Sequence, residues 1–115
     1  ETEGQVERLQ QVFEILGKPA RGKTCEAIQG IIAEGEEIIE EFKGAPALDA
    51  GLISSAQAVE HYEMARYGTL LAWARQLGKK DVVKLLEETF EQESKADLEL
   101  SKLAEKSVNA SAEAV

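Results

Sequence analysis

Three glutamates stand at positions where they can act together as metal ligands. Glu60 and Glu63 fall on one inward stripe of the pattern over residues 47–77, in which the members are spaced alternately three and four residues apart. Glu93 lies on the matching stripe of the pattern over residues 81–105. A buried carboxylate needs a partner because it loses its hydration. Carboxylate oxygens that converge inside a helical bundle suit iron or manganese.

The connection between these two patterns is short, which predicts antiparallel neighbouring helices. Counted from Lys79, Glu63 lies 16 residues back and Glu93 lies 14 residues on. At about 1.5 Å of rise per residue, the two carboxylates then lie within roughly 3 Å of each other in height. Asp97 falls close to the level of Glu60 and is a less central candidate. The spacing therefore predicts a metal centre formed by Glu60, Glu63 and Glu93.

Two further residues are weaker candidate ligands. His61 is the only histidine in the chain, and it follows Glu60 directly, so its side chain points about 100° around the helix from the inward stripe. We expect it beside the site or at an interface, with direct ligation as the alternative. Glu1 is the first residue of the chain and is a further candidate ligand.

Other side chains on these stripes leave two interpretations open. Tyr67 follows Glu63 by one helical turn, and it is either a redox-active phenol beside a metal or a core tyrosine that hydrogen-bonds a carboxylate. Gln5 and Arg8 lie on a stripe of the first helix and can pair with buried carboxylates. The carboxylates therefore form either a metal centre or a structural polar layer.

Four helical segments must position these residues. Apolar periodicity predicts helices over residues 1–16, 25–43, 47–77 and 81–105, with Gly17 ending the first and Thr24 capping the second. The pattern predicts an all-α, antiparallel, ferritin-like helical bundle with one long crossover that contains the short second helix. We expect residues 1–115 to form a single domain that is truncated at its N-terminus, because the first long helix of such a bundle would precede Glu1. Residues 107–115 are expected to fray.

Composition excludes several classes of function. The formal net charge is −9, with 22 acidic and 13 basic residues, which disfavours binding to nucleic acid or an anionic membrane. One cysteine cannot form an intramolecular disulfide, so we expect a reducing, cytoplasmic environment. The sequence contains no Gly-rich phosphate loop, no CxxC pair and no apolar run of membrane-spanning length.

Several motifs resemble one known family. The runs at residues 1–9 (ETEGQVERL), 22–25 (GKTC), 56–63 (AQAVEHYE) and 67–74 (YGTLLAWA) closely resemble the YciE/YciF family of ferritin-like proteins, domain of unknown function 892. The resemblance covers essentially the whole chain. It implies a bacterial, stress-response-type protein, often dimeric, with a fold related to rubrerythrin. It also implies that the chain lacks the first helix of the family and the start of the second, which would supply the other half of a two-metal site.

Two functional hypotheses follow from these features. The first is a di-iron or di-manganese centre that handles O₂ or peroxide or oxidises iron, although Ala96 stands where a Glu-x-x-His pair would place its histidine, so the centre is expected to be incomplete or empty in this chain. The second is a non-catalytic helical assembly module with structural carboxylates. Whether the protein is an enzyme stays open. Three long helices leave an open apolar groove, which predicts a homodimer or swapped homo-oligomer.

Overall fold

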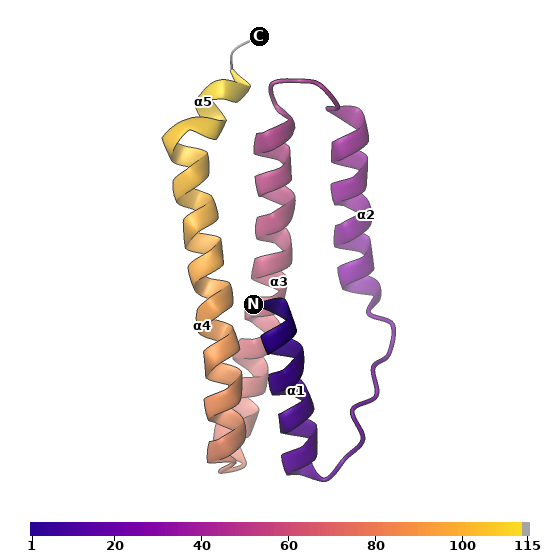
Figure 1. Ribbon diagram of the computed structural model, residues 1–115, viewed down its shortest axis with the longest axis vertical. Helices are drawn as coiled ribbons and strands as arrows, with labels where there is room; N and C mark the ends of the chain where they lie inside the picture. Colours follow the sequence, from indigo (N-terminus) through magenta and orange to yellow (C-terminus); the bar gives the residue numbers. More distant parts are fainter. Residues whose placement is uncertain (114–115) are drawn as a thin grey trace. The chain divides into compact units, whose positions relative to one another are not determined.

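The protein is all-α, as the sequence predicts. The computed structural model describes residues 1–113, and these contain helices and no strand (Figure 1). The helices, in chain order, are α1 (Thr2–Leu16), α2 (Glu26–Glu41), α3 (Leu48–Gln76), α4 (Lys80–Leu103), the π-helical segment η1 (Ala104–Val108) and α5 (Asn109–Ala112). The four predicted helices are confirmed, and their ends differ from the prediction by no more than two residues.

The chain forms two compact units, each assembled from two separate stretches. Unit 1 consists of residues 1–24 and 63–94, and unit 2 consists of residues 25–62 together with the chain from Lys95 onward. Unit 1 therefore contains α1, the second half of α3 and the first half of α4. Unit 2 contains α2 and the remaining halves of the two long helices. The short helix α2 is part of the crossover between α1 and α3, as expected.

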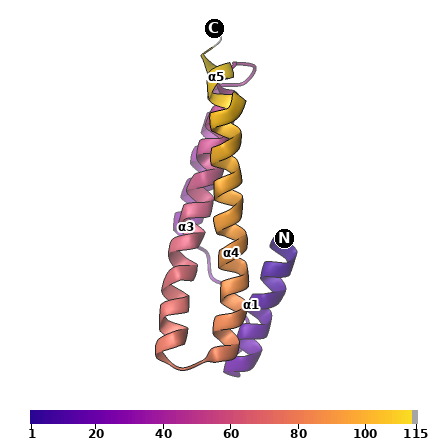
Figure 2. The same ribbon diagram turned by 90° about the vertical axis from the view of Figure 1, so that its left-hand side faces the viewer.

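Unit 1 contains the larger apolar core. Its buried apolar residues come from all three helices of the unit and are Val12, Leu71, Ala74, Val82 and Leu86. Figure 2 shows α1 lying beside α4 in this unit. The connection between α3 and α4 turns at Gly78, whose φ of 69° is in the left-handed region that glycine tolerates best.

The inward stripe of α3 departs from the strict three-and-four spacing beyond Glu63. Continued with that spacing, the stripe through Glu60 and Glu63 predicts that Leu70, Ala74 and Leu77 face inward. Ala74 is buried, but Leu70 and Leu77 are 39% and 70% exposed, whereas Leu71 is only 3% exposed. An α-helix has 3.6 residues per turn, so a strict alternation of three and four residues drifts by about 20° per heptad. Leu71 follows the buried Ile53 by 18 residues, which is five full turns.

The helix α1 ends as its sequence predicts. Gly17 adopts a left-handed conformation with a φ of 68°, and its N–H donates to the carbonyl oxygen of Glu14. The buried residues of α1 are Gln5 and Val12. The apolar side chains of α1 are only partly buried, since Val6 is 51% exposed.

Unit 2 depends on close packing between α2 and α3. A side chain cannot fit at Gly51, because a Cβ there would lie 2.7 Å from Cγ2 of Ile38. The prediction that Thr24 caps α2 is wrong. The cap is Cys25, whose Sγ accepts a hydrogen bond from the N–H of Ile28 at 3.4 Å. Sulfur replaces the usual oxygen here because the extended backbone conformation needed at a cap falls one residue later than expected.

The end of the chain is helical as far as Ala112. We predicted that residues 107–115 fray, and the part of that prediction that concerns residues 114–115 lies outside the described residues. Among residues 1–113, no helix combines the length and the apolar character that a membrane crossing requires.

Candidate metal centre

A pair of carboxyl groups lies between α3 and α4 in unit 1. Glu63 comes from α3 and Glu93 from α4, and their side chains are hydrogen-bonded to each other. Glu93 is 5% exposed. Two ionised carboxylates within hydrogen-bonding distance repel each other. The hydrogen bond between Glu63 and Glu93 therefore requires a proton on one of the two carboxyl groups. The hydrogen bond to Glu93, burial, and the charge of Glu93 together raise the pKa of Glu63 from 4.5 to about 7.

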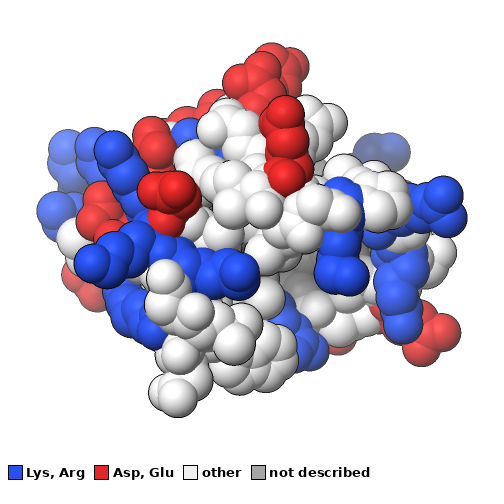
Figure 3. All heavy atoms as spheres, turned by 90° about the horizontal axis from the view of Figure 1, so that it is seen from below, with Lys and Arg blue, Asp and Glu red and all other residues white. Residues whose placement is uncertain are grey.

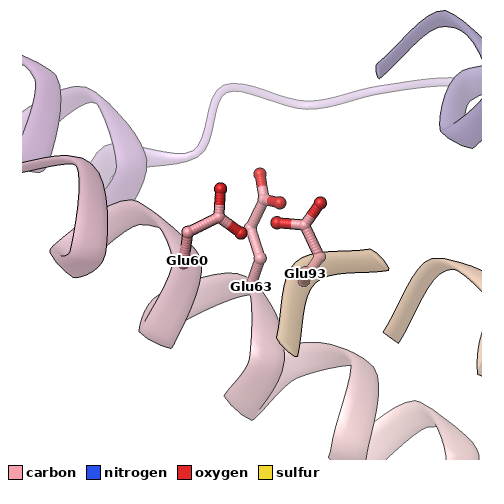
Figure 4. Close-up of side chains that lie close together, drawn as sticks. All are labelled: Glu60, Glu63 and Glu93. Atoms are coloured by element: carbon pink, nitrogen blue, oxygen red, sulfur yellow. The ribbon is translucent and has the colours of Figure 1, made fainter. Parts of the chain in front are cut away.

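Glu60 completes a group of three, which we call the carboxylate cluster. It precedes Glu63 by three residues in the uninterrupted helix α3, and this spacing puts both side chains on one face. One carboxylate oxygen from each of Glu60, Glu63 and Glu93 lies within 4.8 Å of the other two. Figure 4 shows the three side chains gathered in one place, two from α3 and one from α4. The structure therefore brings together the three residues that the sequence predicts as metal ligands.

The buried amide of Gln5 fixes the orientation of Glu93. Its Nε2 donates to Oε1 of Glu93 at 2.5 Å and to Oε1 of Gln92 at 3.2 Å. Gln5 is 8% exposed, so this side chain is part of the interior of unit 1. The sequence predicted that Gln5 can pair with a buried carboxylate, and this contact confirms it. Gln92 was not anticipated, although it follows Thr89 by three residues on the buried face of α4.

Arg8 links α1 to α4 one turn further from the cluster. Its Nε donates to Oγ1 of Thr89 at 2.9 Å, and its Nη2 donates to Oε1 of Gln92. Thr89 has no exposed surface. The nearest ion-pair partner of Arg8 is the surface residue Glu88 at 3.5 Å. The prediction that Arg8 can pair with a buried carboxylate is therefore not met by this ion pair, because Glu88 is exposed.

Tyr67 lies among these groups and stays protonated. Burial raises the pKa of its hydroxyl, and the charges of Glu63 and Glu93 raise it further, against the smaller opposing effects of Arg8 and a hydrogen bond to Thr89. The phenol is consequently a neutral hydrogen-bonding group over the range in which Glu63 titrates. This environment accommodates both interpretations of Tyr67, as a core tyrosine and as a phenol beside a metal.

The weaker candidates lie elsewhere. In unit 2, Nε2 of His61 is 3.0 Å from Oδ2 of Asp97, and the imidazole side chain is 66% exposed. Asp97 also accepts a hydrogen bond from Nε2 of Gln57 at 3.3 Å. Glu1 is exposed and precedes the first turn of α1. Among the described residues, the carboxylate cluster includes none of His61, Asp97 and Glu1.

The chemistry available to the carboxylate cluster follows from its donors. Oxygen is its only ligand type, and three carboxylates held this close favour a divalent cation that offsets their mutual repulsion. The raised pKa of Glu63 favours a proton on the pair of Glu63 and Glu93, and this proton would offset part of the repulsion. A cation that binds there must displace this proton, so binding is expected to be weaker in acid.

The fold and this cluster define an all-α helical bundle with inward-facing carboxylates. The family model for the domain of unknown function DUF892 matches residues 1–113, and the chain belongs to this family. It is 46% identical over 114 residues to Protein YciF of Escherichia coli strain K12, a match that covers 98% of this chain and 69% of that protein.

Solved structures support the same assignment. The crystal structure of the E. coli stress protein YciF matches with a TM-score of 0.87 and 45% identity over 94% of this chain and 69% of that one. YcfI of Rhodopseudomonas palustris, described as a candidate structural protein, matches with a TM-score of 0.83 and 47% identity over 87% of this chain and 64% of that one. The chain thus spans about two thirds of the length of these relatives. The resemblance seen in the sequence is confirmed.

Proposed function

We propose that the protein binds iron or manganese through Glu60, Glu63 and Glu93. The observation that carries this proposal is the convergence of three carboxylate oxygens within 4.8 Å of one another. Three carboxylate side chains are half of the six ligand residues that a two-metal centre uses in a ferritin-like bundle. When bound, such an ion would supply redox chemistry towards O₂, peroxide or ferrous iron.

The residues of this chain would prepare the site for the ion. Gln5 holds Glu93 by its Oε1 and thereby fixes one donor before binding. The pair formed by Glu63 and Glu93 would release its proton as the ion binds. Tyr67 would remain a neutral donor of a hydrogen bond beside the carboxylates. We place this activity in the cytoplasm, where a reducing environment suits the single cysteine, Cys25.

Metal titration tests the proposal directly. Calorimetric titration with Mn²⁺, and with Fe²⁺ under anaerobic conditions, is expected to give saturable binding that weakens as the pH falls through about 7. Glu63→Gln and Glu93→Gln are expected to lower the affinity at least tenfold each, because each removes an anionic ligand. Glu91→Gln is the matched control, since Glu91 lies on α4 with Glu93 and is exposed.

The failure of this test would favour the second functional hypothesis. If the wild-type protein and the control bind no metal at neutral pH, the carboxylate cluster is a structural polar layer. The cluster would then stabilise unit 1. The hydrogen bond from Gln5 to Glu93 joins α1 to α4, and the hydrogen bond between Glu63 and Glu93 joins α3 to α4. The protein would be a non-catalytic helical assembly module.

A further inference from the structure

The end of unit 1 around the α3–α4 connection carries a concentration of positive charge in an acidic protein. We call it the basic end and define it as residues 15–24 and 75–84. These two stretches contain seven basic residues and a single acid, Asp81. The basic residues are all exposed and are Lys18, Arg21, Lys23, Arg75, Lys79, Lys80 and Lys84. Arg75 alone among them has an ion pair given by the structure, with Glu87 at 2.5 Å.

Apolar surface lies beside this charge. Trp73 is 63% exposed and Leu77 is 70% exposed. Both line an apolar groove of about 340 Å³ in unit 1, which also includes Leu16 of α1 and Lys79 of the connection. Figure 3 looks onto this end and shows Lys and Arg side chains on either side of an uncharged area. An apolar area bordered by polar groups is typical of a protein interaction site.

The helix α2 of unit 2 has the complementary character. Residues 26–41 contain six carboxylates and no basic residue, and all six are exposed. Ile32 and Ile39 are 50% and 46% exposed, and they are separated by about two helical turns, so they lie on one side of the helix. Glu36 and Glu40 accompany them on neighbouring positions. The exposed surface of α2 is therefore acidic with an apolar stripe.

We propose that the basic end of one copy of this chain binds the acidic helix α2 of a second copy. Salt-sensitive attraction between Lys79, Lys80 and the glutamates of α2 would orient the contact, and Ile32 and Ile39 would cover Trp73 and Leu77. The contact joins two different surfaces, so each copy can bind two others and form a chain of copies. A closed dimer forms instead where the basic end of each copy binds α2 of the other.

The character of α2 favours a second copy of the chain as the partner of the basic end. An anionic membrane or a nucleic acid would also attract the basic end, but it would meet a protein of net charge −9. A second copy has the same net charge, but its helix α2 offers carboxylates beside the exposed Ile32 and Ile39, which match both the charge and the apolar groove of the basic end. Both surfaces are also present in equal amounts in any sample of the protein.

Sedimentation of charge-reversed variants tests the proposal. We compare the wild-type protein with Lys79→Glu/Lys80→Glu and with Glu36→Lys/Glu40→Lys. Each double variant alone is expected to self-associate at least about tenfold more weakly than the wild type. An equimolar mixture of the two is expected to associate again, because the reversed charges complement each other. Raising the salt from about 0.02 M to about 0.5 M, where the Debye length falls from about 20 Å to about 4 Å, is expected to weaken all of these associations.

A matched control separates a local contact from net charge. Lys102→Glu/Lys106→Glu changes the net charge by the same amount as Lys79→Glu/Lys80→Glu, and both lysines are exposed residues of unit 2. This control is expected to associate like the wild type, and circular dichroism checks that every variant is folded. A wild-type protein that stays monomeric at low salt would overturn the proposal, as would a mixture that fails to associate. Binding of the wild type to anionic vesicles without self-association would assign the basic end to a membrane instead.

Discussion

Replacing Glu63 by glutamine should stabilise the metal-free protein at neutral and alkaline pH. The pKa of Glu63 is 4.5 when the chain is unfolded and about 7 when it is folded. Below about pH 4.5 the carboxyl group is protonated in both states and imposes no penalty. Between about pH 4.5 and 7 the unfolded chain releases a proton that the folded chain retains, so the free energy of unfolding falls as the pH rises. Above about pH 7 the carboxyl group is ionised in both states, and the folded state is destabilised by the full amount.

The size of the effect follows from the difference between the two pKa values. A difference of about 2.5 corresponds to about 3.4 kcal/mol. Glu63 is only partly buried, so solvent screening reduces the expected value to about 1–2 kcal/mol. Glutamine keeps the side-chain shape and can donate a hydrogen bond to Glu93 without a charge. For a chain of this size, the gain corresponds to a rise in Tm of about 4–10 °C at pH 8.

Thermal unfolding followed by circular dichroism provides the assay. The wild type, Glu63→Gln and the exposed control Glu91→Gln are melted between about pH 4 and pH 8 with a chelator present. The stabilisation by Glu63→Gln should disappear at about pH 4. With Mn²⁺ in place of the chelator its sign should reverse, since the variant then lacks a ligand. An increase in Tm that is equal at every pH would refute the shared-proton explanation.

Further substitutions test the packing around the site and in unit 2. Gln5→Leu should lower the free energy of unfolding by about 1–3 kcal/mol in urea titrations, because it leaves the buried Glu93 without its donor. Gly51→Ala should lower it by about 1–3 kcal/mol, because the added Cβ would meet Ile38 at 2.7 Å. Gly30→Ala, in the helix that carries Ile38, should raise it by about 1 kcal/mol, because nothing lies within 4 Å of the added Cβ. The predictions for Gly51→Ala and Gly30→Ala are refuted if both variants change the free energy of unfolding in the same direction.

Counting residues along the two long helices was enough to predict the cluster. Glu63 and Glu93 were expected at one height because a short connection leaves little freedom in the register of an antiparallel pair, and they are hydrogen-bonded. Glu60 then follows from helix geometry. The buried neighbour Gln5 was also accessible, since polar residues on an inward stripe need partners.

Other features depend on information that the periodic pattern does not contain. The sequence does not reveal whether Leu70 or Leu71 faces the core, because a drift of the stripe becomes visible only over several turns. The cap at Cys25 was missed because Thr24 is the better capping residue by type, and only the backbone conformation decides between them. The contact between His61 and Asp97 needs the side-chain conformations of both residues.

The wide separation of contacts along the chain bears on how fast unit 1 assembles. Arg75 and Glu87 pair across only 12 residues, whereas Gln5 reaches Glu93 across 88. For a flexible chain, closing the longer loop costs about 1.8 kcal/mol more than closing the shorter one. The α3–α4 hairpin is therefore expected to form first during folding, with α1 docking on it late. Contacts of Gln5 would then affect mainly the rate of unfolding. The detachment of α1 would therefore determine the lifetime of the folded state of unit 1.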